Sequence, residues 1–331
     1  MSLTNNSSLN ILLQASGKRY PLDEIHYSDI VTFRECPAKF GYKVVDSTSF
    51  VTNNAMILGS MFHKAIEHAI IDNNRGSVIT SDSQWYKNAG DTEYWKSVID
   101  GIMFIDSERK HEATESDING WVSKFVTKDL FLGKDLREIV KDTYNFINVT
   151  GHRIIQSELR LKYEDLYGLH VGTLDLLLQD KNDNLVIGDI KTSGLWNKLL
   201  KGSSYMKQSM STEQVRHHPQ MKHYHWLGWR AGYFEKDDVK AYCILYPANL
   251  VPYKDGKRKV RGLPITLAPC VEGGVHRYQE DLYQWLQMIQ CGVNVRTYPN
   301  VYGKIECPRC PWKDECLSDQ SSTQVPNYLR G

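Results

Sequence analysis

Two acidic residues and a lysine lie in neighbouring apolar segments, GTLDLLLQD and NLVIGDIKTS. Asp175 lies in the first segment, and Asp189 and Lys191 lie in the second, two positions apart and so on one face of a strand. The intervening KNDN is typical of a tight hairpin turn, which would bring Asp175 beside the other two. Carboxylates surrounded by Leu, Val, Ile and Gly are costly to bury unless a cation binds them.

This group predicts a site for Mg²⁺ or Mn²⁺, which favour oxygen ligands. Such a cation can polarise a phosphodiester and lower the pKa of an attacking water. Lys191 would then orient that water or stabilise the developing charge. A structural ion pair on a sheet is the alternative, because D-x-K alone is a common sequence.

Two further side chains could complete the site. Glu158 lies in the preceding strand-like segment QSELRL, and His63 lies in LGSMFHKAIEHAIID, where the apolar spacing predicts a helix. His63 alone would be interpreted as a partly buried helix histidine. Glu164 competes with Glu158 as the upstream carboxylate.

The elements that must position these residues change in type at Gly151. Helical patterns precede this residue, and three short strands joined by turn signals follow it, before a helix across 211–232, a strand across 239–247 and a helix across 274–292. The layout predicts layers of helices on a sheet, an α/β fold. We divide the chain into a lead-in (1–26), a helical region (27–150), a core (151–270) and a C-terminal segment (271–331).

Composition limits the class of protein. The chain has 331 residues, 41% of them hydrophobic, and a formal net charge of +1. This is ordinary for a globular protein and argues against a histone-like coat for nucleic acid. No apolar run approaches the ~18–20 residues of a membrane helix, and MSLTNNSSLN lacks the features of a signal peptide. We expect a cytoplasmic protein of a bacterium, an archaeon or a phage-infected cell, without a membrane partner.

Four of the seven cysteines have an unusual arrangement. Cys307, Cys310 and Cys316 form C-x2-C-x5-C, and Cys36 stands far upstream. Zinc accepts four thiolates, usually in closely spaced pairs, whereas iron–sulfur clusters are also held by four thiolates and often take one remote ligand. Either centre would join the start of the chain to its end.

Basic and aromatic residues are interleaved over residues 191–230, which hold seven Lys or Arg and one acidic residue. A second basic stretch, 254–261, has Asp-Gly at the tip of an expected hairpin. Together they form a plausible track for single-stranded nucleic acid, with a solvated charged loop as the alternative. The candidate contacts are Lys198, Lys201, Arg216, Lys257 and Arg258. The histidines at 217, 218, 223 and 225 could instead suggest a transition-metal site, although Pro219 interrupts them.

Taken in order, the motifs resemble those of the RecB-like branch of PD-(D/E)XK nucleases. This branch includes lambda-type exonucleases, RecB and AddB nuclease domains, CRISPR-associated iron–sulfur exonucleases and exonuclease-five-like enzymes. The matching segments are Gly59-S-M-F-His63, Glu158, Gly172-T-L-Asp175, Asp189-I-Lys191 and Gln220-M-K-H-Tyr224.

The resemblance implies a restriction-endonuclease-like core, with a central mixed β-sheet flanked by helices. His63, Asp175, Asp189 and the main-chain carbonyl of Ile190 would bind Mg²⁺ or Mn²⁺. Lys191 would be catalytic together with Asp175, Asp189 and Glu158, while Gln220 and Tyr224 would hold DNA. The iron–sulfur members imply a 4Fe–4S cluster on Cys36, Cys307, Cys310 and Cys316, clasping the terminal segments, with zinc as the alternative.

The expected function is a metal-dependent DNA exonuclease acting on single-stranded ends, for which the resemblance favours 5′→3′ polarity. DNA-end processing in recombination, repair or CRISPR adaptation is compatible with it. No GxxxxGK[ST] phosphate loop is present, so ATP-driven unwinding would need a separate helicase or recombination partner. The alternative is a DNA-binding scaffold subunit that cuts poorly. Members of the family also form toroidal oligomers.

Overall fold

The computed structural model describes residues 24–37, 39–40, 54–73, 77–105, 115–125, 135–192, 209–250 and 263–291. These residues form two compact units. The first takes in the described residues up to Phe40, Lys162–Gly172 and those from His276 onwards. The second takes in the described residues from Asn54 to Leu161 and Thr173–Val275. The units therefore interleave along the chain, in contrast to the four consecutive segments drawn from the sequence.

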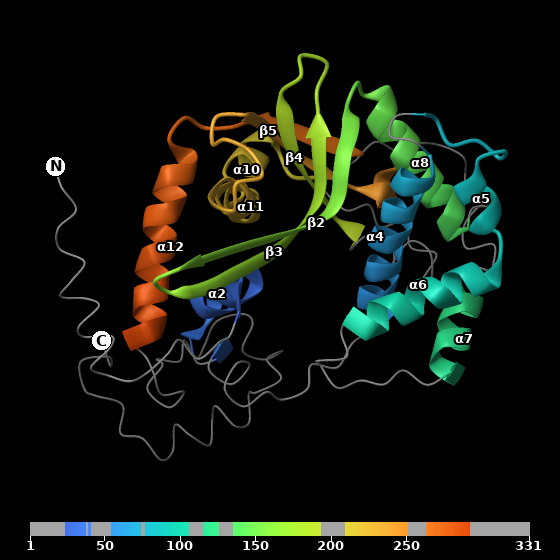
Figure 1. Cartoon of the computed structure of the whole chain (residues 1–331), viewed down its shortest axis with the longest axis horizontal. Coiled ribbons are helices and arrows are strands. Elements are labelled where there is room, and N and C mark those ends of the chain that lie inside the picture. The colour runs from blue at the N-terminus through green and yellow to red at the C-terminus, as the bar shows by residue number, and fades with distance from the viewer. Residues whose placement is uncertain are drawn as a thin grey trace. The chain divides into compact units, whose positions relative to one another are not determined.

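The sheet of the second unit contains the three strands expected after Gly151 and two more. Its strands are β2 (Arg153–Asp165), β3 (Gly168–Gln179), β4 (Leu185–Ile190), β5 (Val239–Leu245) and β6 (Ile265–Pro269). β2 pairs with β3, β3 with β4 and β5 with β6, while β4 and β5 run parallel (Figure 1). The sheet is therefore mixed.

The turn between β3 and β4 is the expected hairpin. The Asp180 carboxylate accepts hydrogen bonds from the backbone N–H groups of Asn182 and Asn184 at 2.8 and 2.9 Å. Asp183 has a φ of 64°, a left-handed conformation that Asp tolerates better than most residues. This turn fixes the register in which Leu177 lies opposite Ile187.

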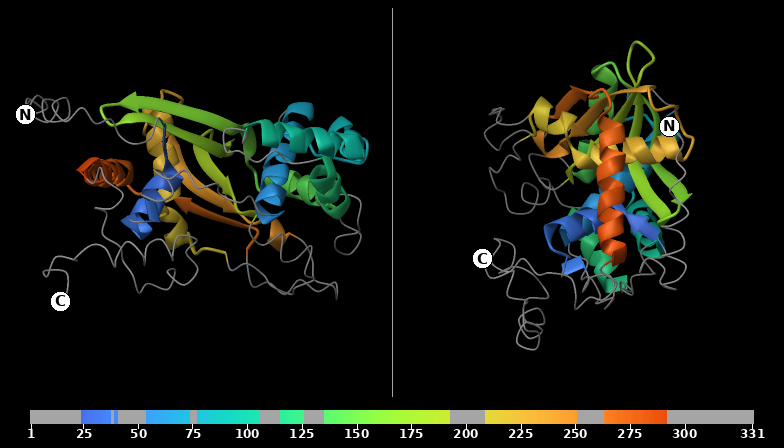
Figure 2. Two further views of the ribbon diagram at one scale, coloured as in Figure 1. Left: turned by 90° about the horizontal axis from the view of Figure 1, so that it is seen from below. Right: turned by 90° about the vertical axis from the view of Figure 1, so that its left-hand side faces the viewer.

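Helices pack on one face of this sheet. They are α4 (Asn54–Asp72), α5 (Gln84–Asn88), α6 (Thr92–Ile105), α7 (Glu115–Phe125) and α8 (Leu136–Val149). Alternate strand residues such as Leu176, Leu178 and Val186 join Phe62 of α4 and Trp95 of α6 in one buried core. α4, α6, α7 and α8 stay grouped in the further views of the molecule (Figure 2).

α10 (Thr212–Arg216) and α11 (Pro219–Arg230) lie between β4 and β5 in the chain. A helical crossover of this kind is what allows two strands to run parallel. α11 begins at Pro219, whose missing N–H costs nothing in the first turn of a helix. His225 of α11 contacts the Tyr242 hydroxyl of β5 at 2.9 Å, and the short helix η3 (Pro247–Asn249) follows β5.

The first unit adds a strand where the sequence suggested a loose lead-in. β1 (Glu24–His26) pairs in parallel with the start of β3, with Ile25 opposite His170. The expectation of an unstructured segment up to residue 26 is therefore wrong for these three residues, because their backbone groups complete the β3 edge.

Two helices complete the described part of the first unit. α2 (Tyr27–Glu35) begins after His26, whose backbone N–H donates to the Asp29 carboxylate at 3.1 Å. In α12 (Gly274–Cys291), the Trp285 ring lies 4.2 Å from the Arg34 guanidinium.

A central mixed sheet flanked by helices is the restriction-endonuclease-like α/β arrangement that the sequence predicted, and the fold class is confirmed. Within the described residues, every helix is too short or too polar to cross a bilayer.

Candidate active site

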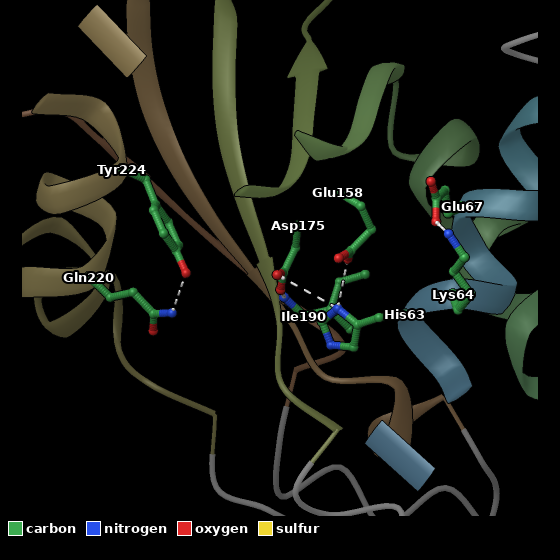
Figure 3. A network of polar contacts seen from close by, with 8 residues as sticks. All are labelled: His63, Lys64, Glu67, Glu158, Asp175, Ile190, Gln220 and Tyr224. Atoms are coloured by element: carbon green, nitrogen blue, oxygen red, sulfur yellow. Dashed lines mark hydrogen bonds and ion pairs between the residues drawn. The ribbon is translucent and has the colours of Figure 1, made fainter. Parts of the chain in front are cut away.

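His63, Glu158 and Asp175 converge from three elements of the second unit. His63 lies on α4, Glu158 on β2 and Asp175 on β3 (Figure 3). His63 Nδ1 lies 3.1 Å from Glu158 Oε1 and 3.6 Å from Asp175 Oδ1. One potential ligand atom from each residue lies within 4.8 Å of the other two, a spacing that a single metal ion could bridge.

Asp175 is held at the corner where β3 and β4 separate. The ladder between these strands runs from Gln179↔Leu185 to Leu176↔Gly188. Two residues beyond Gly188, the Ile190 N–H donates at 2.7 Å to Oδ2 of Asp175 rather than continuing the ladder. This bond turns Oδ1 toward His63, and the Asp175 side chain is 13% exposed.

Glu158 reaches the site through an irregularity in β2. Its φ is 48°, a left-handed conformation unusual for a residue with a side chain. Ile154 is buried before Glu158, and Leu159 and Leu161 are buried after it. Ile154 and Leu159 are an odd number of residues apart, so the alternation of buried positions shifts by one residue between them. Such a local break in alternation re-aims a side chain, as a β-bulge does.

The two candidate carboxylates on β2 belong to different units. Glu158 lies against His63, whereas Glu164 is exposed on the part of β2 that belongs to the first unit. The structure therefore places Glu158 in the site.

The charges in this corner favour a cation. Burial alone would lower the pKa of His63, but Asp175 and Glu158 outweigh it and raise that pKa to about 9. Burial, followed by the like charges of Asp189 and Glu158, raises the pKa of Asp175 to about 7, although His63 opposes this shift. Carboxylate oxygens and an imidazole nitrogen form a donor set that suits Mn²⁺ or Mg²⁺. The residues present therefore fit the divalent cation that the sequence predicted.

Lys191 stands at the centre of a second polar group. Its ammonium lies 2.8 Å from Asp189 Oδ2 and donates to Gln220 Oε1 at 2.8 Å. Gln220 in turn donates to the Tyr224 hydroxyl at 3.0 Å (Figure 3). Gln220 and Tyr224 lie one turn apart on α11, so the helix brings both to the end of β4.

The buried environment of this second group keeps the Tyr224 hydroxyl protonated. Asp189 has only 3% of its side chain exposed, against 25% for Lys191. Burial, with the Asp175 charge second, raises the pKa of Tyr224 well above its ordinary value, so its hydroxyl keeps its proton. Because that oxygen already accepts from Gln220, its O–H is available to donate.

Sequence reasoning missed the position of His218. This residue precedes Pro219 at the start of α11, and Lys191 and Asp189 both act on it electrostatically. Burial first, and then the Lys191 charge, lowers its pKa and keeps the imidazole neutral. Its place two residues before Gln220 was the available signal.

The neighbouring histidines have separate partners. His217 pairs with Glu213 at 2.8 Å, and His225 contacts Tyr242 and the Lys236 carbonyl. The contacts of these described residues do not favour the transition-metal alternative.

Of the remaining predicted site residues, the structure describes Arg216 and Cys36. Arg216 forms a 2.9 Å ion pair with Glu213, and Cys36 is a half-buried free cysteine at the C-terminal end of α2. The other predicted nucleic-acid contacts and cluster ligands lie outside the described residues: Lys198, Lys201, Lys257, Arg258, Cys307, Cys310 and Cys316.

Comparison with known proteins bears on the same residues. A search of curated proteins finds no match to the chain. The family model described as the PD-(D/E)XK nuclease superfamily matches residues 25–317, most of the chain and both polar groups described above. With a mixed sheet that carries Asp175 and the Asp189–Lys191 pair, the chain belongs to the PD-(D/E)XK nuclease superfamily.

Proposed function

We propose that this protein is a Mg²⁺- or Mn²⁺-dependent DNA exonuclease of the RecB-like branch, hydrolysing phosphodiester bonds from single-stranded ends. The observation that carries the proposal is the convergence of His63, Glu158 and Asp175. Asp175 also accepts a hydrogen bond from Ile190, the last residue of β4, and Lys191 follows directly. Membership of a nuclease superfamily supports the same chemistry.

The residues that would hold the cation are His63, Glu158 and Asp175, with Asp189 and the Ile190 carbonyl as further candidates. When bound, the cation would polarise the phosphodiester and lower the pKa of a water molecule. Lys191 donates to Gln220 and forms an ion pair with Asp189, and its ammonium would also orient a water or stabilise charge on a phosphate oxygen.

Gln220 and Tyr224 would act as positioning groups for this lysine and for DNA. The Gln220 amide oxygen holds Lys191, while its nitrogen holds the Tyr224 oxygen. The Tyr224 O–H can then donate to a phosphate oxygen, and phosphate contacts set the register of bound DNA.

A single-stranded end is the proposed substrate, with 5′→3′ degradation. The motif resemblance and the basic, aromatic-rich sequence over residues 191–230 support this choice. In this proposal a separate helicase, recombination or CRISPR protein exposes the strand, and the nuclease processes DNA ends in the cytoplasm.

A 4Fe–4S cluster on Cys36, Cys307, Cys310 and Cys316 belongs to the same proposal. It is supported by the C-x2-C-x5-C spacing with one remote cysteine and by the half-buried, free thiol of Cys36. Its role would be structural, joining segments at the two ends of the chain.

The test compares wild type with Lys191→Ala, using Lys181→Ala in the exposed β3–β4 turn as the matched control. Protein purified anaerobically receives single-stranded DNA labelled at either the 5′ or the 3′ end, with Mn²⁺, Mg²⁺ or EDTA. We expect metal-dependent degradation, unchanged in Lys181→Ala and reduced about 10²–10³-fold in Lys191→Ala, since a donor to developing charge is lost.

The label released first reports polarity, and an internally labelled circle separates exonuclease from endonuclease activity. Equal cleavage by wild type and Lys191→Ala would contradict the assigned site. Tight DNA binding without cleavage by either protein would support the scaffold alternative instead.

A further inference from the structure

The first turns of α4 approach the end of β4 at Gly59. A Cβ added there would lie 2.9 Å from Thr192 Oγ1, closer than real Cβ contacts allow. Thr192 directly follows Lys191, so this contact joins α4 to the catalytic end of β4.

Backbone conformation does not explain the glycine. Gly59 lies inside a helix and lacks the positive φ that would favour glycine. A helix interior normally disfavours glycine relative to alanine. Space is therefore the reason for glycine at this position, because the Thr192 hydroxyl occupies the volume that a side chain would need.

The same face of α4 carries His63 one turn further along. Gly59 and His63 are about 6 Å apart along the helix axis, at ~1.5 Å per residue. A displacement of α4 at Gly59 would therefore shift His63 away from its 3.1 Å and 3.6 Å distances to Glu158 and Asp175.

We propose that Gly59 and Thr192 form a spacing contact that positions His63 against Glu158 and Asp175, making Gly59 a positioning residue of the cation site. This inference rests on the proposed function, because it gives Gly59 a role in the cation site of that function. Its direct consequence is a link between the size of residue 59 and the affinity for a divalent cation.

The test uses Mn²⁺ affinity, measured by calorimetry on metal-stripped protein. Gly59→Ala should weaken Mn²⁺ binding about 10-fold or more, because ligands misplaced by a fraction of an ångström bind poorly. Gly101→Ala is the matched control, since Gly101 lies inside α6 with nothing within 4 Å of an added Cβ.

Removing the colliding atom should rescue the defect. In Gly59→Ala/Thr192→Ala the next nearest atom, Thr192 Cβ, lies at an ordinary 3.9 Å, so Mn²⁺ affinity should return to that of Thr192→Ala alone. Gly59→Ala/Thr192→Val should stay defective, because a methyl group replaces the hydroxyl.

Wild-type affinity in Gly59→Ala, or a defect that persists in Gly59→Ala/Thr192→Ala, would overturn the inference. If Gly59→Ala does not fold, the double variant decides: a folded protein with restored affinity supports the contact, and an unfolded one overturns it. Wild-type protein that binds Mn²⁺ yet leaves DNA intact would overturn the proposed function, while this comparison would still hold.

Discussion

At the scale of single residues, Asp175 links the sheet to the candidate cation site. One carboxylate oxygen accepts the Ile190 N–H, and the other faces His63. The position of this side chain in the site therefore depends on where β3 and β4 separate. Burial, and then the negative charge of Asp189 and Glu158, raises the pKa of Asp175, whereas Asp175 and Glu158 raise the pKa of His63 against the effect of burial.

The His63 pKa makes a prediction about stability. A folded-state pKa of about 9, above the ordinary 6.5, means that protonated His63 stabilises the metal-free protein fully below pH 6.5. This contribution should disappear as pH rises through about 9. We expect the free energy of unfolding to fall by roughly 2–3 kcal/mol from this residue between these limits.

Urea unfolding of metal-free protein at a series of pH values measures this effect. His63→Gln is the matched variant, which should lose this part of the pH dependence. Bound Mn²⁺ should oppose the loss at high pH, because the cation competes with the proton. Identical pH profiles for wild type and His63→Gln would contradict the proximity of His63 to the two carboxylates.

Glu158 makes a second prediction at this scale. Glu158→Gln keeps the shape of the side chain but removes the charge beside His63, so Mn²⁺ should bind at least ~10-fold more weakly. Glu164→Gln, an exposed position on the same strand, is the control and should bind as wild type does. Calorimetric titration measures the Mn²⁺ affinity of both variants. Weaker Mn²⁺ binding by Glu164→Gln than by Glu158→Gln would instead identify Glu164 as the site carboxylate.

At the scale of elements, α11 must pack closely on the loop before β5 to present Gln220 and Tyr224. A Cβ added at Gly228 would lie 2.3 Å from Phe234 Cζ, inside a buried aromatic contact. Glycine is therefore needed here for space, as it is at Gly59 on α4.

Gly228→Ala should lower the free energy of unfolding by about 1–3 kcal/mol, because the Phe234 ring must move to admit the new methyl group. Gly101→Ala inside α6 has open space and should instead raise stability by about 0.5–1 kcal/mol. Denaturant unfolding monitored by circular dichroism measures both. Similar effects of the two substitutions would contradict the close contact.

At the scale of the whole molecule, β2 and β3 pass through both compact units, so the strands that carry Glu158 and Asp175 also form part of the first unit. In that unit β1 pairs with β3, and α2 ends at Cys36. A centre bound at Cys36 would therefore stabilise a unit that shares two strands with the candidate active site.

The cluster proposal is tested at this scale. Protein purified anaerobically should contain about four irons and four sulfides per chain, as expected for a 4Fe–4S cluster. Cys36→Ser should lose most of this content and melt at a lower temperature, whereas Cys270→Ser, at a half-buried free cysteine, should retain it. Zinc without sulfide in the wild type would establish the alternative centre.

The local features of this chain could be predicted from sequence because they depend on neighbouring residues. Short β-type runs joined by turn signals predicted β2, β3 and β4, and KNDN predicted the turn that sets Asp175 near Asp189. The spacing of Gln220 and Tyr224 likewise placed them on one face of a helix.

Other features depend on contacts between distant segments. Glu158 could be separated from Glu164 only by its contact with His63, and β1 acquired its strand conformation by pairing with β3. The approach of Gly59 to Thr192 and of His218 to Lys191 likewise joins residues far apart in the chain.

The sequence by itself thus determined the residue types, the three consecutive strands after Gly151 and the turn between β3 and β4. Tertiary structure alone decided which carboxylate meets His63 and which glycine allows α4 to approach the end of β4. The physical reason is that alternation and turn formation are local properties of a chain, whereas close packing and electrostatic proximity depend on how separate elements meet.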